Sequence, residues 1–439
     1  MKLVMKHFVT LLSTVGLCSV SNHAAASAFQ IWEQDVTNIE NFHAGYAILA
    51  QNASIAFYNP AGITLFKNQQ LVFGAVGAFT DIQYNGTIMV NTLNRGLPQP
   101  VVAQGGGPIF IPDLSYVAPI TDTIGFGLTV VAPFGLQTNY GSQTILRYAS
   151  TLASTKVVDI SPSLGIQVND KLSFGAGLDA QKMNAEFDLV GVSGEDSDTP
   201  STNKGNDTAY GYHVGGLYQF TPDTRVGLSY HSKVSHHLKG TSKFVGPIAD
   251  AYNDGPLVST QTKVNIPLPA YTALSGFHHF TESKWSVMGS VIYTQWSVIK
   301  DLVLQNVAGI IDFTPSTTIN VVMPQNYSNT WSVSVGTDYA YSDKLTLRGG
   351  VGFDDSPVQL NYRTVQLPDE NRYAVGLGGH YQASKTIGLD LGWTHLFVRQ
   401  ATIQPPLLSL QLGDEQVTTV GYSNGGADIV GLQLTWDLV

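Results

Sequence analysis

The chain has only one cysteine, Cys18, in 439 residues. Cys18 lies in the N-terminal segment, so disulfide bonds cannot hold the rest of the chain together. Charged residues are also scarce, at 12% of the chain, whereas soluble domains have about 25%. The net charge is −10 without any basic stretch, which argues against nucleic-acid binding. After the N-terminal segment no window reaches the roughly 18 uncharged apolar residues of a spanning helix, so the chain can cross a membrane only with strands.

The first residues have the order of a secretory signal peptide. Lys2 and Lys6 precede an apolar run at 8–20, which is followed by small residues at 24–28. This order is typical of segments that are removed on export. The apolar run is shorter than the roughly 20 residues that a membrane-spanning helix needs, so an uncleaved anchor is the weaker alternative. We expect residues 1–26 to be the signal peptide of a protein exported to a Gram-negative envelope.

Beyond residue 68, apolar residues recur at every second position. Ile124, Phe126 and Leu128, for example, alternate with glycine and threonine, as in strands with one apolar and one polar face. Short polar turns alternate with long irregular connectors along this region. The six turns lie at 121–123, 169–171, 221–224, 281–284, 342–344 and 383–386. The seven long connectors lie at 81–112, 138–155, 191–207, 243–259, 305–327, 354–371 and 403–425.

These turns and connectors delimit fourteen strands, with both chain ends on the side of the short turns. Short turns on one side and long loops on the other are typical of outer-membrane barrels, and a secreted β-solenoid is the alternative. We expect an all-β fold, a fourteen-stranded antiparallel transmembrane β-barrel in the bacterial outer membrane. The lumen of such a barrel is too wide for its wall side chains to fill. Residues 27–68 should therefore form a hatch that plugs the barrel formed by residues 69–439.

Four stretches of the chain, taken together, form a recognisable pattern. They are Ala28-Phe29-Gln30, "NASIAFYNPAGI" at 52–63, "APFGLQTNYG" at 132–141, and "GGVGFDDSPV" with "LPDENRY" at 349–373. In this order and in register with fourteen strands, they resemble the FadL family of outer-membrane transporters for long-chain fatty acids and other hydrophobic compounds. The resemblance implies a hatch in the lumen and a kinked third strand that opens a side gap in the wall.

The resemblance also assigns roles to residues. It implies ligand contacts or gating for five hatch residues, and it places the lateral gap at three residues of the kink. The hatch residues are Phe29, Asn59, Pro60, Ala61 and Gly62, and the kink residues are Pro133, Phe134 and Gly135. Gln51 and Asn52 depart from the family pattern, because many family hatches have an acidic residue there. A hatch salt bridge at that position is therefore not expected.

Pro133 can also be interpreted without the resemblance. A proline inside a membrane strand cannot donate a hydrogen bond, so a neighbouring carbonyl is left unpaired in hydrocarbon. With Gly135 two residues further on, a kink or a bulge is expected, unless the strand has already left the membrane. Asn59-Pro60 has a similar local meaning, because proline disfavours helix at the preceding residue. The hatch helix should end there, or the pair forms an ordinary turn.

A carboxylate headgroup would need a cation in the lumen. By strand alternation Arg348 falls on the inward face, and Lys182 and Arg147 are other candidates. Asp354 and Asp355 follow the same strand as Arg348. We interpret Arg348, Asp354 and Asp355 as candidates for headgroup binding or gating, with a simple turn or a loose cation site as the alternative for the two aspartates.

Several patterns imitate catalytic or metal sites. Residues 421–425 match G-x-S-x-G, but a nucleophile elbow belongs between a strand and a helix of an α/β fold. The pairs 236–237 and 278–279 are histidines without nearby cysteines or clustered carboxylates. His231 and Ser232 are adjacent, so on a strand they point to opposite faces, which argues against a phospholipase. No phosphate-binding loop occurs either, and we predict a protein that is not an enzyme and has no cofactor or metal.

Apolar connectors at 100–112, 305–327 and 405–412 could form an oily groove over the barrel mouth. The sequence thus predicts passive transport of long-chain fatty acids or similar hydrophobic molecules, captured by the external loops and released sideways at the kinked strand. An aromatic-hydrocarbon channel of the same family, a general porin and an adhesin are the alternatives. The expected partners are the hydrophobic ligand, outer-membrane lipid or lipopolysaccharide and the barrel assembly machinery, with no nucleic acid. We expect a monomer.

Overall fold

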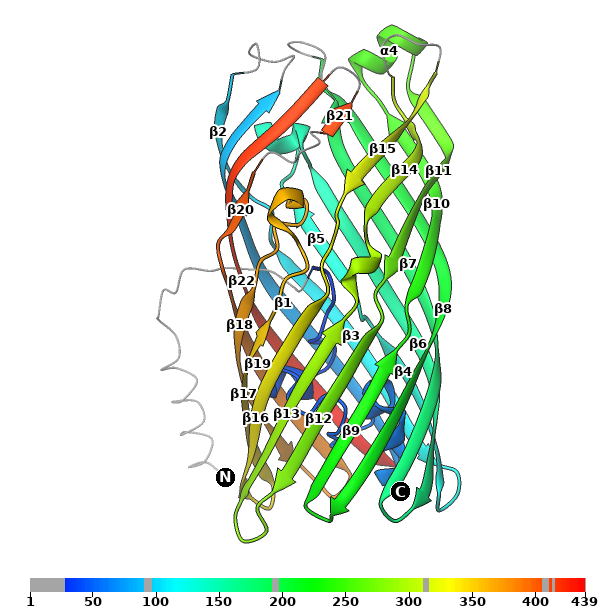
Figure 1. Ribbon diagram of the computed structural model, residues 1–439, viewed down its shortest axis with the longest axis vertical. Helices are drawn as coiled ribbons and strands as arrows, with labels where there is room; N and C mark the ends of the chain where they lie inside the picture. The colour runs from blue at the N-terminus through cyan, green and yellow to red at the C-terminus, as the bar shows by residue number, and fades with distance from the viewer. Residues whose placement is uncertain are drawn as a thin grey trace.

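The computed structural model describes residues 28–90, 97–191, 197–310, 316–404, 410–412 and 415–438. The signal peptide expected at 1–26 lies outside these residues. The chain forms a closed antiparallel barrel of fourteen strands around an N-terminal plug (Figure 1). The first strand, β1 (Gln69–Val90), pairs with the last, β22 (Glu415–Leu438), and this pairing closes the barrel. The predicted fold class is confirmed.

Several of the fourteen strands are interrupted, so the wall consists of shorter segments that follow one another along the same strand path. Between β1 and β22 these segments are β2 (Gln99–Gln104), β3 (Pro108–Pro119), β4 (Ile124–Val131), β5 (Gly135–Asn139), β6 (Leu152–Asn169), β7 (Leu172–Gly191), β8 (Thr199–Thr221), β9 (Thr224–His231), β10 (Val234–Phe244), β11 (Leu257–Leu268), β12 (Tyr271–His279), β13 (Trp285–Thr294), β14 (Asp301–Ala308), β15 (Thr318–Pro324), β16 (Thr330–Ser342), β17 (Leu345–Asp354), β18 (Arg372–Gln382), β19 (Ile387–Val398), β20 (Ala401–Ile403) and β21 (Leu410–Leu412). The six short turns lie where the sequence predicts them.

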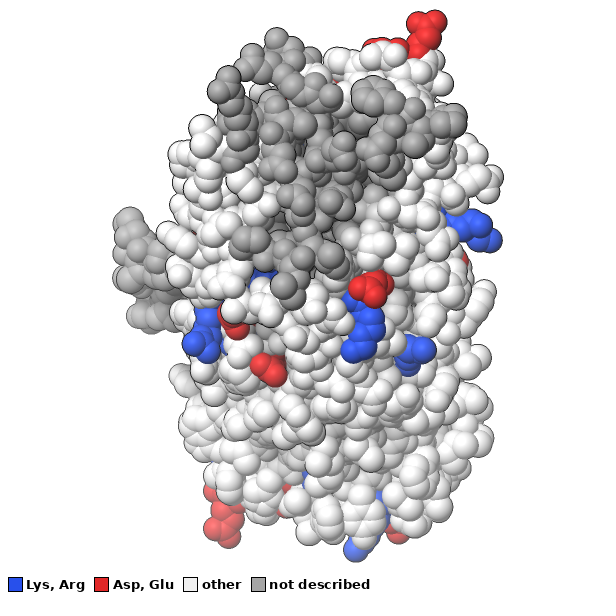
Figure 2. All heavy atoms as spheres, turned by 45° about the horizontal axis from the view of Figure 1, so that its top comes forward, with Lys and Arg blue, Asp and Glu red and all other residues white. Residues whose placement is uncertain are grey.

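Apolar side chains face outward, and small or polar side chains face the lumen. In β6, Ile160 and Leu164 are about half exposed, whereas Ser161 and Ser163 are buried. Figure 2 shows a belt without charged side chains between a charged level near half height and the lower rim. This arrangement is the reverse of a soluble protein and fits a wall that faces lipid. Among the described residues, no helix is long and apolar enough to cross a bilayer.

The strands extend further into the upper part of the barrel than predicted. β1 continues to Val90 and β8 begins at Thr199, although the sequence predicts connectors at 81–112 and 191–207. Their outward positions in this region include polar residues such as Lys204. Above the membrane a strand needs no apolar outer face, so the apolar alternation stops while the backbone pairing continues. These predicted connector boundaries are therefore wrong.

The predicted apolar connectors are also partly strands. The connector at 305–327 contains the end of β14 and all of β15, which pair with each other as a hairpin. The connector at 100–112 contains most of β2 and the start of β3. Residues 405–409 of the third apolar connector lie outside the described residues.

The hatch lies inside the barrel, where it forms the dark blue segment of Figure 1. Its helices are α2 (Val36–Asn41), α3 (Ile55–Tyr58) and the 3₁₀ helix η1 (Pro60–Leu65). The other helices among the described residues are α4 (Pro247–Asn253) and the 3₁₀ helices η3 (Ile145–Tyr148), η4 (Trp296–Val298) and η5 (Leu360–Tyr362).

Local sequence determines where the hatch helices begin and end. α2 begins because the Asp35 carboxylate accepts a hydrogen bond from the Asn38 N–H at 2.9 Å. It ends at Phe42, which adopts a left-handed conformation. α3 ends at an extended Asn59, as expected before Pro60. The chain does not turn directly into β1, because η1 intervenes.

Glycines of the wall allow the hatch backbone to approach closely. A Cβ atom added at Gly227 in β9 would overlap the carbonyl oxygen of Ala47, and one added at Gly350 in β17 would overlap that of Asn41. These glycines hold the plug in one position, because any larger residue would push the hatch backbone away from the wall.

Candidate functional site

The wall has a break in its third strand. β4 ends at Val131 and β5 begins at Gly135, with Pro133 between them. On one side of the break, residues 108–113 of β3 pair with β1 but not with β4. On the other side, β5 forms its ladder in the described part of the chain with β6, and towards the β3 side it has a single hydrogen bond, from the Asn139 N–H to the Gly105 carbonyl before the start of β3. Two strand edges therefore face each other without a ladder of hydrogen bonds between them.

The start of the hatch supplies the backbone partners that the break removes. The Ile31 N–H donates to the Pro133 carbonyl at 2.9 Å, and the Gly135 N–H donates to the Phe29 carbonyl at 2.8 Å. Gln30 and Phe134 form the bridge between these two contacts. The Pro133 carbonyl and the Gly135 N–H thus pair with the plug, and these two polar backbone groups of the break are satisfied away from water.

A cavity of about 450 Å³ lies between the hatch and the break. This volume is within the range of about 300–1,000 Å³ that is typical of ligand pockets. Its lining is mostly apolar and includes Ile109, Ile111, Phe134, Leu136, Leu396 and Ile429. Ile429 faces the lumen, whereas Phe110 and Val158, which also line the cavity, are 71% and 46% exposed on the outer face. The cavity therefore extends from the barrel interior to the lipid-facing surface.

Two carboxyl groups line the inner part of this cavity. Asp369 accepts hydrogen bonds through Oδ2 from the Ala28 N–H at 2.9 Å and from the Ser356 hydroxyl at 2.5 Å. Burial raises the pKa of Asp369 to about 6. Burial also raises the pKa of Glu33, although the nearby Arg372 guanidinium opposes this shift. Asp369 Oδ1 and Glu33 Oε1 are buried without a hydrogen-bond partner.

A second, smaller cavity of about 90 Å³ adjoins the first. The two share Leu136, Thr155 and Leu367 in their linings, and Phe29 lines the second one. The Phe29 ring packs against the rings of Phe134 and Trp296, with centroids 6.0 and 5.1 Å apart. Phe29, a predicted hatch residue, therefore lies at the boundary between the two cavities.

The other predicted hatch residues fix the hatch to the wall and do not line either cavity. The Asn59 amide donates to the carbonyl of Ala47 at 2.7 Å and to that of Gly216 in β8 at 3.1 Å. Its Oδ1 accepts from the Ala61 N–H. Asn59 thus contacts β8, which is not an edge of the break. Pro60 packs its carbonyl against the wall glycine Gly165, and Gly62 lies against Ile55 within the hatch.

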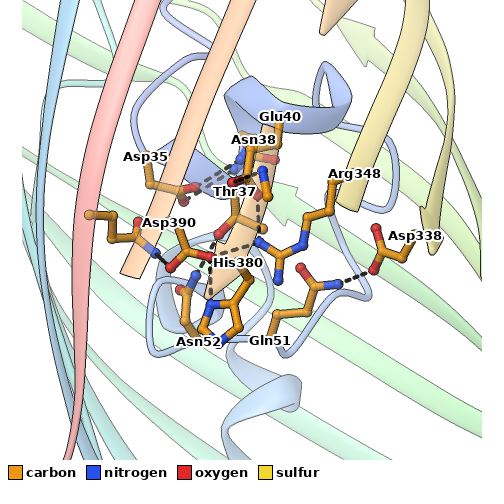
Figure 3. A network of polar contacts seen from close by, with 12 residues as sticks. Asp35, Thr37, Asn38, Glu40, Gln51, Asn52, Asp338, Arg348, His380 and Asp390 are labelled. Carbon is orange, nitrogen blue, oxygen red and sulfur yellow. Dashed lines mark hydrogen bonds and ion pairs between the residues drawn. The ribbon is translucent and has the colours of Figure 1, made fainter. Parts of the chain in front are cut away.

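Arg348 faces the lumen as predicted, but its guanidinium already has partners (Figure 3). It donates to Glu40 of α2 at 2.5 Å and to Asp390 of β19 at 2.9 Å, and all three side chains are buried. Burial raises the pKa of Glu40 to about 7, against the opposing effect of Arg348. Gln51 occupies the hatch position at which an acidic residue could have formed a salt bridge. Its side-chain amide donates a hydrogen bond to Asp338 of the wall at 2.5 Å. The result is a polar attachment of the hatch instead of a free cation.

Asp354 also belongs to a hatch attachment. Its carboxylate forms an ion pair with Arg372 and accepts a hydrogen bond from the indole of Trp32 in the hatch at 3.2 Å. Asp355 is the next residue in the chain, and its backbone N–H donates a hydrogen bond to the Trp331 carbonyl. The two other predicted cations do not line either cavity. Lys182 is exposed and bonds to Asn206, and Arg147 pairs with Asp198 at 2.7 Å.

One polar cluster has no signal in the sequence. Asp179, His213 and Ser163 are joined in that order by hydrogen bonds of 2.6 and 2.9 Å, and the His231 ring stacks on His213. The residues come from four different strands, so only the barrel register brings them together. The geometry resembles a catalytic triad, but the Ser163 hydroxyl also bonds to the hatch carbonyl of Ala56.

The same cluster offers ligand atoms for a metal ion, all within 4.8 Å of one another. However, the His213 and His231 rings are stacked with only 13° between their planes, so their in-plane lone pairs do not converge on one ion. We interpret the cluster as a further attachment of α3. The G-x-S-x-G serine, Ser423, lies within strand β22 and not at a strand-to-helix turn.

Comparison with known proteins gives four relevant matches. A family model described as "Outer membrane protein transport protein (OMPP1/FadL/TodX)" matches residues 17–437. The long-chain fatty acid transport protein of Salmonella typhi is 26% identical over 406 residues, which cover 87% of this chain and 90% of that protein. The crystal structure of a Pseudomonas aeruginosa FadL homologue has a TM-score of 0.82 at 23% identity and covers 93% of this chain and 99% of its own. That of the Ralstonia pickettii toluene transporter TbuX has a TM-score of 0.65 at 19% identity and covers 92% and 100%.

Proposed function

The chain belongs to the OMPP1/FadL/TodX family of outer-membrane transport proteins, and from this membership we propose that it carries long-chain fatty acids or similar hydrophobic molecules passively across the outer membrane. The observation that carries the proposal is the apolar cavity of about 450 Å³ that extends from the lumen to the lipid-facing surface. The similarity to a long-chain fatty acid transport protein supports the ligand class. We assign no catalytic step to the chain.

The route follows from the two cavities. The ligand enters from the external loops into the smaller cavity, passes Phe29 when the hatch moves, and occupies the larger cavity. In this proposal residues 27–68 act as the movable hatch and residues 69–439 as the barrel. The barrel assembly machinery inserts the chain, which then works as a monomer among lipid and lipopolysaccharide.

Release sideways into lipid is favoured by the free energy of transfer. A chain of about sixteen carbons buried at ~0.8 kcal/mol per methylene gains about 12 kcal/mol, so direct release into water would be very slow. Release into the bilayer replaces one apolar environment with another and costs little. The unpaired edges of β3 and β5 provide the place for this step, because no ladder of hydrogen bonds has to be broken there.

Aromatic hydrocarbons are the second candidate ligands. The similarity to a toluene transporter supports them, and the apolar lining of the cavity suits them equally well. A general porin is disfavoured, because the hatch fills the lumen with buried side chains.

Uptake of radiolabelled oleate tests the proposal directly. The chain is expressed in a Gram-negative host that lacks its own long-chain fatty acid transporter, and insertion into the outer membrane is verified. We expect uptake above the level of the empty host. Toluene uptake without oleate uptake would favour the second candidate, and uptake of neither would contradict the transport proposal.

The lateral step is tested with Gly135→Leu. A Cβ atom at Gly135 would lie 2.8 Å from Cδ1 of Ile31, and the leucine side chain would fill the cavity at the break. We expect normal insertion and a loss of oleate uptake. Gly276→Leu is the matched control, because a Cβ atom at Gly276 would meet nothing within 4 Å. Unchanged uptake in Gly135→Leu would rule out release through this break.

A further inference from the structure

One lysine lies at the outer end of the cavity. Lys156 of β6 pairs with Gly135 in the ladder beside the break, and its side chain is exposed on the outer face of the barrel. It is also part of the cavity lining. Within the described residues the ammonium group has no hydrogen-bond or ion-pair partner. A charge placed on the lipid-facing side without a partner is costly unless it lies at the headgroup level or has a binding role.

The same strand shows where the headgroup level lies. Below Lys156 the outward residues of β6 are all apolar, from Val158 to Val168. These ten steps correspond to about 33 Å of strand, or about 25 Å of bilayer at the usual tilt of ~40°. Lys156 is the next outward residue, so it lies at the outer boundary of the hydrocarbon. The break in the third strand therefore opens at the level where a fatty acid carboxylate is stable in the membrane.

Neighbouring strands carry polar outward residues in register with Lys156. Lys156 is in register with Asn184 on the next strand, and the register continues through Asn206, Lys239 and Lys263 on the strands that follow. All of them are exposed. Figure 2 likewise shows charged side chains near half height above an uncharged belt. Lys239 therefore shares the outward orientation and the exposure of Lys156, but it is not part of the cavity lining.

The two ends of the cavity differ in charge. The inner end has the carboxyl groups of Glu33 and Asp369, and the membrane end has the ammonium group of Lys156. The Arg372 guanidinium lies near both carboxyl groups, so the inner end does not have a simple negative charge. The ammonium group at the mouth attracts a carboxylate, whereas a neutral hydrophobic molecule is not attracted to it.

We propose that Lys156 is a carboxylate-binding site at the membrane mouth of the cavity, which selects long-chain fatty acids and draws their headgroup out through the break first. This inference rests on the proposed transport function and specifies its substrate class. The rival role for Lys156 is binding the phosphate groups of outer-leaflet lipid, which other outward lysines above the apolar belt would share.

The test compares two cargoes and three variants. Cells that express the full chain take up radiolabelled oleate or its uncharged ester, methyl oleate. Lys156→Gln should lower oleate uptake by about tenfold, the size expected for one charge-assisted hydrogen bond, and leave methyl oleate uptake unchanged. Lys156→Arg should retain most oleate uptake, because it keeps the positive charge. Lys239→Gln should behave like the unmodified chain with both cargoes.

Three results would overturn the inference and leave transport standing. They are unchanged oleate uptake in Lys156→Gln, an equal loss for both cargoes, and an equal loss in Lys239→Gln, which indicates lipid phosphate binding. Uptake of methyl oleate but not oleate by the unmodified chain would overturn it as well. If the unmodified chain takes up neither cargo, the proposed function itself fails, and the two failures are distinguishable.

Discussion

Arg348 shows what can and cannot be predicted for a single residue. Strand alternation places its side chain in the lumen, and the structure agrees. Its partner Glu40 is 308 residues away in the sequence, and no local pattern links the two. The sequence therefore predicts a cation that is free for a headgroup, whereas the structure has a buried ion pair that attaches α2 to the wall. Lys156, at the mouth of the cavity, has no motif around it, and only the register with Gly135 reveals its position.

Replacement of Arg348 should destabilise the protein. Arg348→Gln leaves Glu40 buried without its cation, although Asp390 keeps its contact with His380, and breaking a buried ion pair costs about 3–5 kcal/mol. We expect a loss of this size in the free energy of unfolding, measured by denaturant titration in lipid vesicles. Arg147→Gln is the control, because its pair with Asp198 is partly exposed and should contribute at most about 1 kcal/mol. Equal losses in both variants would show that Arg348 does not hold the hatch.

At the scale of elements, the sequence predicts strand paths better than strand ends. Pro133 lies between the end of β4 and the start of β5, and its missing N–H removes a hydrogen bond from a membrane strand. The upper strand ends are missed because the outward alternation stops where the membrane ends, while the backbone ladder continues. The pairing of Ile31 and Phe29 with the break is also missed. It joins segments about 100 residues apart, and nothing in either segment specifies the other.

The contact between hatch and wall can be tested at a glycine. Gly227→Ala places a Cβ atom against the carbonyl oxygen of Ala47, so the hatch has to shift away from β9. Overpacking of this kind costs about 1–3 kcal/mol. We expect faster hydrogen exchange of the hatch amides near Ala47. Gly276→Ala, on the adjacent strand β12, meets nothing within 4 Å and should leave the exchange unchanged. The same exchange in both variants would mean that close approach at Gly227 does not position the hatch.

At the scale of the whole molecule, scarcity of charge and a period of two are sufficient to predict a plugged barrel. The low charge content excludes an ordinary soluble surface, and the even number of strands with one side of short turns gives the topology. The transport route is not contained in these properties. It depends on a cavity formed by residues from both ends of the chain, such as Ile31 and Ile429, which only the closed fold brings together.

Whether the hatch must move as the ligand passes is a question about the whole molecule, and a reversible crosslink answers it. An added Cβ atom at Gly336 of β16 would lie 3.2 Å from Cβ of Asn41 in α2, close to the roughly 3.5–4.5 Å between the Cβ atoms of a disulfide. The chain has only Cys18 as a native cysteine, so the double variant Asn41→Cys, Gly336→Cys should form the intended bond. Oxidised, it should lose oleate uptake, and dithiothreitol should restore it. Each single variant is a control for the substitution itself. Full uptake by the oxidised double variant would show that α2 stays attached to the wall during transport, and that only the first hatch residues around Phe29 have to move.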